Sequence, residues 1–241
     1  MTTIPSALHG ADTLGSLQDW RTVAALIDAT LLRPDASRND VELLCRQALH
    51  YGYAAVFVHP TYLREAAWIL RGSQVKAGAP VGFSTGATFP SVKLCEAEEL
   101  LRAGATELDM VMNIAALKSG DRALVQSDME GVIKVAHEAG VLVKIILETG
   151  VLDLHEKLLA SQLALAAGAD YLKTSTGLVG GASVDDVALL RGVVGHRAGV
   201  KASGGIRTLA DLTRMVLAGA DRIGTSNPVA ILRELSAPDL L

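Results

Sequence analysis

The sequence of 241 residues has little of what marks several classes of protein. Its two cysteines, Cys45 and Cys95, form no CxxC pair, and its six histidines show no HxH or HExxH spacing, so neither a disulfide framework nor a metal site is expected. The net charge of -4 argues against a nucleic-acid surface. No apolar run approaches the length of a membrane span, and the N-terminus lacks the pattern of a signal peptide. We therefore expect a cytoplasmic protein that binds neither nucleic acid nor membrane.

What the sequence does have is enough apolar residues for a large core. Half of the residues are hydrophobic, and the mean hydropathy is +0.33. One unit recurs, in which an amphipathic helix ends in Ala-Gly and a short apolar strand follows, at 100–109, 165–172 and 216–224. Glycine suits the left-handed position just past the C-terminus of a helix. The recurrence indicates a chain built from helix and strand in alternation.

Eight strands are predicted, with helices between them. We place the strands near 23–28, 54–58, 79–84, 106–111, 141–147, 169–173, 199–202 and 220–224, and helices over 38–50, 92–103, 121–139, 153–167, 183–195 and 208–218. This order predicts one closed (β/α)8 TIM barrel over 1–241, with an extra N-terminal helix within 1–20. A doubly wound open sheet is the alternative, but no Gly-rich dinucleotide turn follows the first strand. No cofactor is expected.

Three lysines are predicted at the ends of strands, where barrel enzymes carry their chemistry. They are Lys144, Lys173 and Lys201. A buried ammonium is costly to desolvate, so such a lysine tends to lose its proton, and the neutral amine forms a Schiff base with a carbonyl substrate. Asp28 and Asp109 should face the same space, because alternate strand residues share a face. The alternative is an ion-pair network that only holds the barrel together.

Two loops have the composition of a phosphate site. Ser203-Gly204-Gly205-Ile206-Arg207 follows the seventh strand, and Gly224-Thr225-Ser226-Asn227-Pro228 follows the eighth. These are the positions where such barrels often bind phosphate, through backbone N–H groups before a helix. The alternative is that the glycines are ordinary turn formers.

Six segments resemble the deoxyribose-phosphate aldolase family, whose members are class I aldolases with a (β/α)8 fold. The segments are 26–32, 82–86, 107–111, 143–149, 173–177 and 201–207. The most specific are Lys-Thr-Ser-Thr-Gly at 173–177 and Lys-Ala-Ser-Gly-Gly at 201–205. The resemblance implies reversible cleavage of 2-deoxy-D-ribose 5-phosphate to D-glyceraldehyde 3-phosphate and acetaldehyde.

The resemblance also implies roles for individual residues. Lys173 would form the Schiff base, and Lys201 with Asp109 would transfer protons. The substrate-binding residues would be Asp28, Thr30, Lys144, Thr174, Gly204, Gly205, Gly224 and Ser226, with Asp28 and Lys144 completing a polar floor. Family members are commonly dimers or tetramers, so a homo-oligomer is expected.

Two positions depart from the family pattern. Phe57 stands where members often carry a cysteine, and Asn227 stands where many carry a second serine. The second change puts the preference for phosphorylated substrates in question. Two other functions stay open: a Schiff-base barrel aldolase acting on a different aldehyde or keto substrate, and a non-catalytic barrel that binds a phosphosugar.

Overall fold

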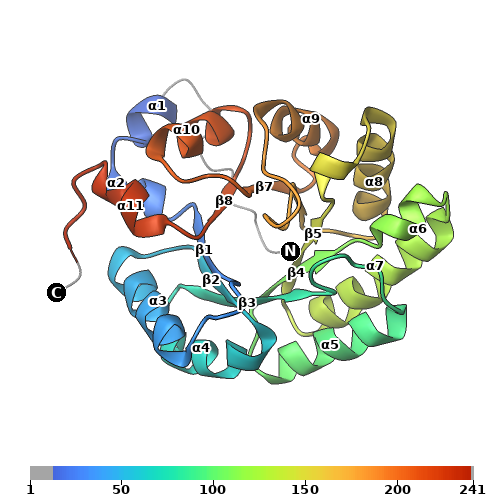
Figure 1. Ribbon diagram of the computed structural model, residues 1–241, viewed down its shortest axis with the longest axis horizontal. Helices are drawn as coiled ribbons and strands as arrows, with labels where there is room; N and C mark the ends of the chain where they lie inside the picture. The colour runs from blue at the N-terminus through green and yellow to red at the C-terminus, as the bar shows by residue number, and fades with distance from the viewer. Residues whose placement is uncertain (1–12, 240–241) are drawn as a thin grey trace.

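Eight parallel strands close into a barrel, and helices surround it as a ring (Figure 1). This computed structural model describes residues 13–239. Each strand pairs with the next in the chain, and β8 closes the barrel against β1. The strands are β1 (Ile27–Leu31), β2 (Ala55–Val58), β3 (Lys76–Val81), β4 (Glu107–Val111), β5 (Leu142–Ile146), β6 (Tyr171–Lys173), β7 (Gly199–Ser203) and β8 (Arg222–Thr225). The predicted (β/α)8 barrel is confirmed.

The helices lie between the strands, and local sequence explains where several begin. Ser37 starts α3 with a capping box, in which its hydroxyl accepts from the backbone N–H of Asp40 and the Asp40 carboxylate accepts from the backbone of Ser37. The helices after β1 are α3 (Arg38–Tyr51), α4 (Leu63–Leu70), α5 (Pro90–Arg102), α6 (Ile114–Lys118), α7 (Arg122–Glu138), α8 (Leu154–Ala166), α9 (Val184–Val194), α10 (Leu209–Leu217) and α11 (Pro228–Arg233). Two 3-10 turns, Pro60–Tyr62 and Thr149–Val151, complete the set.

The chain before β1 differs from the prediction. Two short helices precede the strand, α1 (Thr13–Ser16) and α2 (Trp20–Ala24), while residues 1–12 of the predicted extension lie outside the described residues. The first strand was expected over 23–28. It begins later because the Asp19 side chain caps α2 by accepting from the N–H of Arg21, which keeps the apolar residues at 23–24 helical.

The third strand also lies earlier than expected. It was predicted over 79–84, but β3 covers Lys76–Val81. Its first residues, Lys-Ala-Gly-Ala, lack the β-branched side chains that mark a strand in a sequence. The strand ends before Gly82, whose φ of 65° turns the chain out of the sheet.

The two faces of a strand can have different surroundings, as β4 illustrates. Leu108 and Met110 are fully buried in the hydrophobic cluster that joins strands to helices. Burial of such side chains stabilises the fold by roughly 1.5–3 kcal/mol each. Glu107 and Asp109 alternate with them and point into the barrel, where they meet cations from other strands. The outer face therefore holds the barrel together, and the inner face carries charge.

Candidate active site

Charged side chains from six strands meet inside the barrel. Strands β1, β4, β5, β6, β7 and β8 supply three carboxylates and four cationic groups: Asp28, Glu107, Asp109, Lys144, Lys173, Lys201 and Arg222. Charge balance inside the barrel is reached when one of the three amines is neutral, since a guanidinium stays protonated. The arrangement thus accommodates an uncharged lysine beside charged ones, as Schiff-base chemistry requires.

Asp109 lies at the centre of this cluster. Its Oδ2 accepts hydrogen bonds from Lys173 Nζ and from Lys201 Nζ, each at 2.7 Å. Its Oδ1 accepts from Lys144 Nζ at 3.2 Å. Burial alone would raise the pKa of Asp109, but the three lysines hold it far below the usual range of a carboxyl. Asp109 is therefore a permanent anion that bridges two amines through one oxygen.

A second carboxylate, Asp28, joins Lys201 to Arg222. Lys201 Nζ lies 2.6 Å from Asp28 Oδ2, and Arg222 Nε donates to Asp28 Oδ1 at 2.7 Å. Arg222 also donates from both terminal nitrogens to Glu107, at 3.1 and 3.3 Å. Glu107 in turn accepts from Lys144. These contacts place the carboxylates and cations in alternation across the barrel.

The lysines have different electrostatic surroundings. Burial lowers the pKa of Lys201 to about 8, and the cations of Lys173 and Lys144 act in the same direction against Asp109 and Asp28. Burial would also lower the pKa of Lys144, but Asp109, Glu107 and Asp28 raise it above its usual value. The expectation that such a buried lysine tends to lose its proton is therefore wrong for Lys144, which faces three carboxylates.

The positions of the three lysines along their strands also differ. Lys173 is the last residue of β6, as predicted. Lys144 and Lys201 lie in mid-strand and are completely buried, so the prediction that they occupy strand ends is wrong. Of the three, only Lys173 lines the cavity of about 370 Å³ at the carboxyl ends of the strands. It is 5% exposed, which leaves its amine in reach of a small molecule.

The two glycine-containing loops line the same cavity. Gly204 and Gly205 both have positive φ, of 91° and 78°, after β7, while Gly224 and Ser226 contribute from β8 and the loop after it. Within residues 13–239, no oxygen accepts a hydrogen bond from the backbone N–H of Gly205. Thr30 lines the wall from β1. The cavity thus joins an amine to the loops expected to hold phosphate.

Three predicted binding residues lie behind the cavity wall. Asp28, Lys144 and Thr174 are completely buried and line no part of it. The hydroxyl of Thr174 donates to the carbonyl of Ser203 and accepts from its N–H, so it holds β6 against β7. The structure therefore places these three predicted binding residues outside the lining of the cavity.

Asn227 occupies the cap position before α11 but does not cap it with its side chain. Its amide donates instead to the carbonyl of Arg207 at 3.3 Å, which ties the loop after β8 to the loop after β7. Pro228 is the first helical residue. The departure from the family pattern at this position thus joins the two loops rather than lining the cavity.

Sequence reasoning missed two members of the cluster, Glu107 and Arg222. Each stands two residues before a residue that was recognised, Asp109 on β4 and Gly224 on β8, and so shares its inward face. Glu148 is also buried, and it accepts from the N–H and hydroxyl of Thr176 in the loop after β6. The two-residue period of the strands was the signal that would have found Glu107 and Arg222.

The part of the chain that the structure describes offers neither a metal cluster nor a membrane-spanning helix. No three His, Cys, Asp or Glu side chains there are placed to hold a metal ion. None of the described helices combines the length and apolar character needed to cross a membrane.

The comparisons with known proteins agree with this geometry. The sequence model of the DeoC/LacD family of aldolases matches residues 22–235. The chain belongs to this family. It is 49% identical over 222 residues to the deoxyribose-phosphate aldolase of Thermococcus kodakarensis, covering 91% of this chain and 98% of that protein. It is 50% identical to the enzyme of the same name from Streptococcus pneumoniae, over 86% of this chain and 94% of that one.

Solved structures give the same result for this aldolase-family chain. The deoxyribose phosphate aldolase of Aeropyrum pernix superimposes with a TM-score of 0.86 at 37% identity, covering 93% of this chain and 95% of that one. That structure is described as a tetramer. More distant lyases, such as 2,3-dimethylmalate lyase at 14% identity and a TM-score of 0.58, share the barrel fold alone.

Proposed function

We propose that this chain is a class I aldolase that reversibly cleaves 2-deoxy-D-ribose 5-phosphate into D-glyceraldehyde 3-phosphate and acetaldehyde. The observation that carries the proposal is the contact of Asp109 Oδ2 with both Lys173, at the cavity wall, and Lys201, behind it. One anion thereby couples an accessible amine to a buried one. The family and its named relatives support the choice of substrate.

Lys173 is the proposed nucleophile. Its neutral amine attacks the C1 aldehyde of the open-chain sugar, and the carbinolamine loses water to give a Schiff base. Removal of the C3 hydroxyl proton then breaks the C2–C3 bond. The electron pair of that bond passes into the iminium and forms an enamine, while D-glyceraldehyde 3-phosphate leaves. Protonation of the enamine carbon and hydrolysis release acetaldehyde and restore the amine.

Lys201 and Asp109 are the proposed proton-transfer pair. A group is most effective in proton transfer when its pKa lies near the working pH, and the pKa of Lys201 is about 8. Asp109 is too weak a base to hold a proton for long, because three lysines stabilise its anion. We therefore assign the change of protonation to Lys201 and the bridging role to Asp109, with a water completing the path to the enamine carbon.

The loops after β7 and β8 are the proposed phosphate site. Gly204, Gly205 and Ser226 would bind the phosphate through backbone N–H groups and a hydroxyl, with Gly224 and Thr30 lining the sugar between them and Lys173. Gly224 has a second reason to be glycine. A Cβ there would lie 3.2 Å from Lys201 Cε and 2.8 Å from Ser203 Cβ, so a side chain would displace the buried lysine.

Kinetics test this proposal. We expect retro-aldol turnover of 2-deoxy-D-ribose 5-phosphate by the natural chain and loss of turnover by at least about a thousandfold in Lys173→Ala. Lys76→Ala is the matched control, since Lys76 is an exposed lysine at the start of β3 and should leave activity unchanged. Full activity in Lys173→Ala would remove the proposal.

The non-phosphorylated sugar tests the phosphate site in the same assay. We expect deoxyribose to be cleaved with a much lower kcat/KM than its 5-phosphate. Equal values for the two sugars would favour the alternative that Asn227 has altered the preference, or that a different aldehyde is the substrate.

We also propose that the chain works as a homo-oligomer in the cytoplasm. The named tetramer among its relatives supports assembly, and the free cysteines, Cys45 and Cys95, suit a reducing compartment. Light scattering at working concentration measures the oligomeric state, and a monomer would overturn this part.

A further inference from the structure

An ion pair between the buried Glu107 and the partly buried Arg222 lies beneath the proposed proton-transfer pair and has no role in the scheme above. Glu107 and Arg222 sit on the inward faces of β4 and β8, two residues below Asp109 and Gly224. Neither lines the cavity. The guanidinium of Arg222 donates to both oxygens of the Glu107 carboxylate, at 3.1 and 3.3 Å. Such bidentate pairs have a fixed geometry.

Each member of this pair has a second partner that leads to the lysines. Glu107 accepts from Lys144, which also donates to Asp109. Arg222 donates to Asp28, whose other oxygen lies 2.6 Å from Lys201 Nζ. The pair therefore reaches the amines from two sides, and neither contact involves the cavity.

The charges of Glu107 and Arg222 shift the pKa values of the amines in opposite directions. The Glu107 carboxylate stabilises nearby ammonium ions, because it supplies a negative charge in a site with little water. The Arg222 guanidinium destabilises them, both by its own charge and by engaging the Asp28 carboxylate that also pairs with Lys201 and Lys144. The charges of Glu107 and Arg222 sum to zero, but the two groups lie at different places relative to the amines.

We propose that Glu107 and Arg222 are positioning residues that set the pH at which the amines of the cluster lose their protons. The inference rests on the proposed function, since it assigns these residues to the same Schiff-base reaction. Neither residue touches substrate. They act through Asp28, Lys144 and Asp109 on Lys173 and Lys201.

Several strands place charged or titratable groups around these amines. The groups that face the cluster from the strands are Asp28, Glu107, Asp109, Lys144, Tyr171, Lys173, Lys201 and Arg222, and the Phe57 ring from β2 lies 4.0 Å from Lys201 Nζ and 4.6 Å from Lys144 Nζ. Strand β3 contributes none, since the residues that face β4 there are Gly78, Ala79, Pro80 and Val81. Glu107 and Arg222 are thus two charged members of this set to which the scheme above gives no part.

The test is the pH dependence of Schiff-base formation itself. The enzyme is incubated with acetaldehyde and cyanoborohydride across a pH series, and the rate of irreversible labelling is measured. We expect the rising limb of this profile to move to lower pH by about one pH unit in Glu107→Gln, and to higher pH by a similar amount in Arg222→Gln. Opposite shifts are expected because the variants remove opposite charges.

Charge-conserving variants separate this role from a structural one. Glu107→Asp and Arg222→Lys keep the charge, so each should keep the natural profile even where its rate is lower. The double variant Glu107→Gln/Arg222→Gln removes both charges, and its profile should return towards the natural one. If one single variant fails to fold, the double variant and the other single variant still test whether the two charges have opposite effects on the pH profile.

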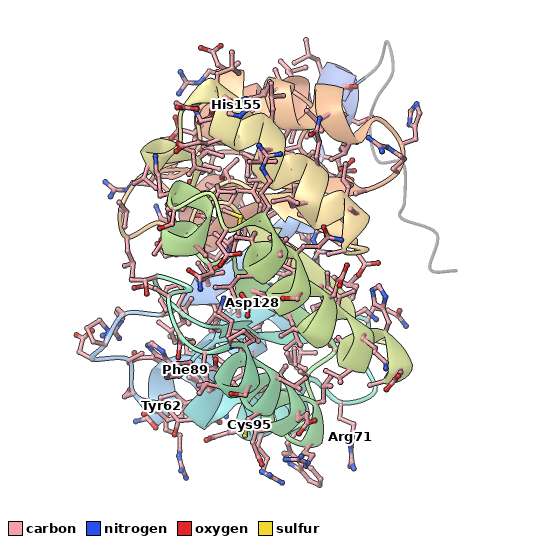
Figure 2. All side chains as sticks on the ribbon, turned by 90° about the vertical axis from the view of Figure 1, so that its right-hand side faces the viewer. Tyr62, Arg71, Phe89, Cys95, Asp128 and His155 are labelled. Carbon is pink, nitrogen blue, oxygen red and sulfur yellow. The ribbon has the colours of Figure 1, made fainter. Side chains whose placement is uncertain are left out.

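Asp128→Asn is the matched control. Asp128 is a buried carboxylate on α7 (Figure 2) that pairs at 2.5 Å with the buried Lys93 of α5, outside the set of barrel lysines. Its removal should lower stability and leave the pH profile in place. Unshifted profiles in both single variants, or shifts in the same direction, would overturn the inference. Labelling of the natural chain would meanwhile show whether the proposed function itself stands.

Discussion

Replacement of Asp109 by asparagine tests how the cluster works, because among residues 13–239 Asp109 alone contacts all three lysines. Asparagine keeps the shape of the side chain but removes its charge. Its amide nitrogen would also place a hydrogen-bond donor next to a lysine ammonium, which can itself only donate. We expect this single change to affect stability and chemistry through separate routes.

The cost in stability follows from burial. Asp109 is 1% exposed and its partners Lys144 and Lys201 are completely buried. Removing one member of a buried ion pair costs about 3–5 kcal/mol, because the remaining charge lies unpaired in the interior. Deprotonation of an amine would offset part of this cost. The free energy of unfolding should therefore fall by no more than about 5 kcal/mol, and the loss should shrink as the pH rises.

The cost in chemistry concerns turnover rather than affinity. Loss of one member of a proton-transfer pair lowers the rate by roughly 10²- to 10⁴-fold. Asp109 does not line the cavity, so the KM for 2-deoxy-D-ribose 5-phosphate should change by less than about threefold. Steady-state kinetics and chemical denaturation measure the two effects. Equal losses in turnover and affinity would refute this reasoning and assign Asp109 a structural role. Asp128→Asn is again the control, and should lose stability with normal turnover.

Two other predictions concern Lys201 and the phosphate loop. Because the folded-state pKa of Lys201 is about 8, below the usual value of 10.5, its burial is unfavourable at neutral pH and the penalty is relieved as the pH rises from about 8 to 10.5. Relative to Lys201→Met, the natural chain should gain about 3 kcal/mol of unfolding free energy over that range in denaturation experiments, and a constant difference would contradict the shift. Gly204→Ala should raise the KM for the phosphorylated sugar more than Gly205→Ala does. Both residues have positive φ, but only at Gly204 would the new Cβ meet backbone, 2.8 Å from the carbonyl oxygen of Gly180. Similar kinetics for the two variants would show that this close approach is unimportant.

Much of the fold was predictable because its pattern is local. The Ala-Gly helix ends and the short apolar strands are visible in the sequence, and they led to eight strands in the right order. The first strand was misplaced because Val23 and Ala24 are apolar in a helix as they would be in a strand. The difference depends on the Asp19 cap, which an apolar pattern does not reveal.

The site was predictable where it depends on the period of a strand and not where it depends on register between strands. Lys173 was found from its place at the end of a strand, and Asp109 from the alternation of residues along its strand. That Lys201 lies opposite both Lys173 and Arg222, and Lys144 opposite Asp109, follows from the parallel pairing of the strands. The completely buried positions of Lys144, Lys201 and Thr174 depend on that three-dimensional pairing. The sequence pattern therefore did not distinguish the residues behind the cavity from those that line it.

The central claim is that access, and not acidity alone, selects the nucleophile. Lys201 has the lowered pKa but is completely buried, whereas Lys173 lines the cavity. Incubation with acetaldehyde and borohydride, followed by proteolysis and mass spectrometry, identifies the lysine that carries the trapped ethyl group. We predict labelling of Lys173, in the peptide that contains Thr174 and Ser175. An ethyl group on Lys201, or no labelled lysine, would contradict the account.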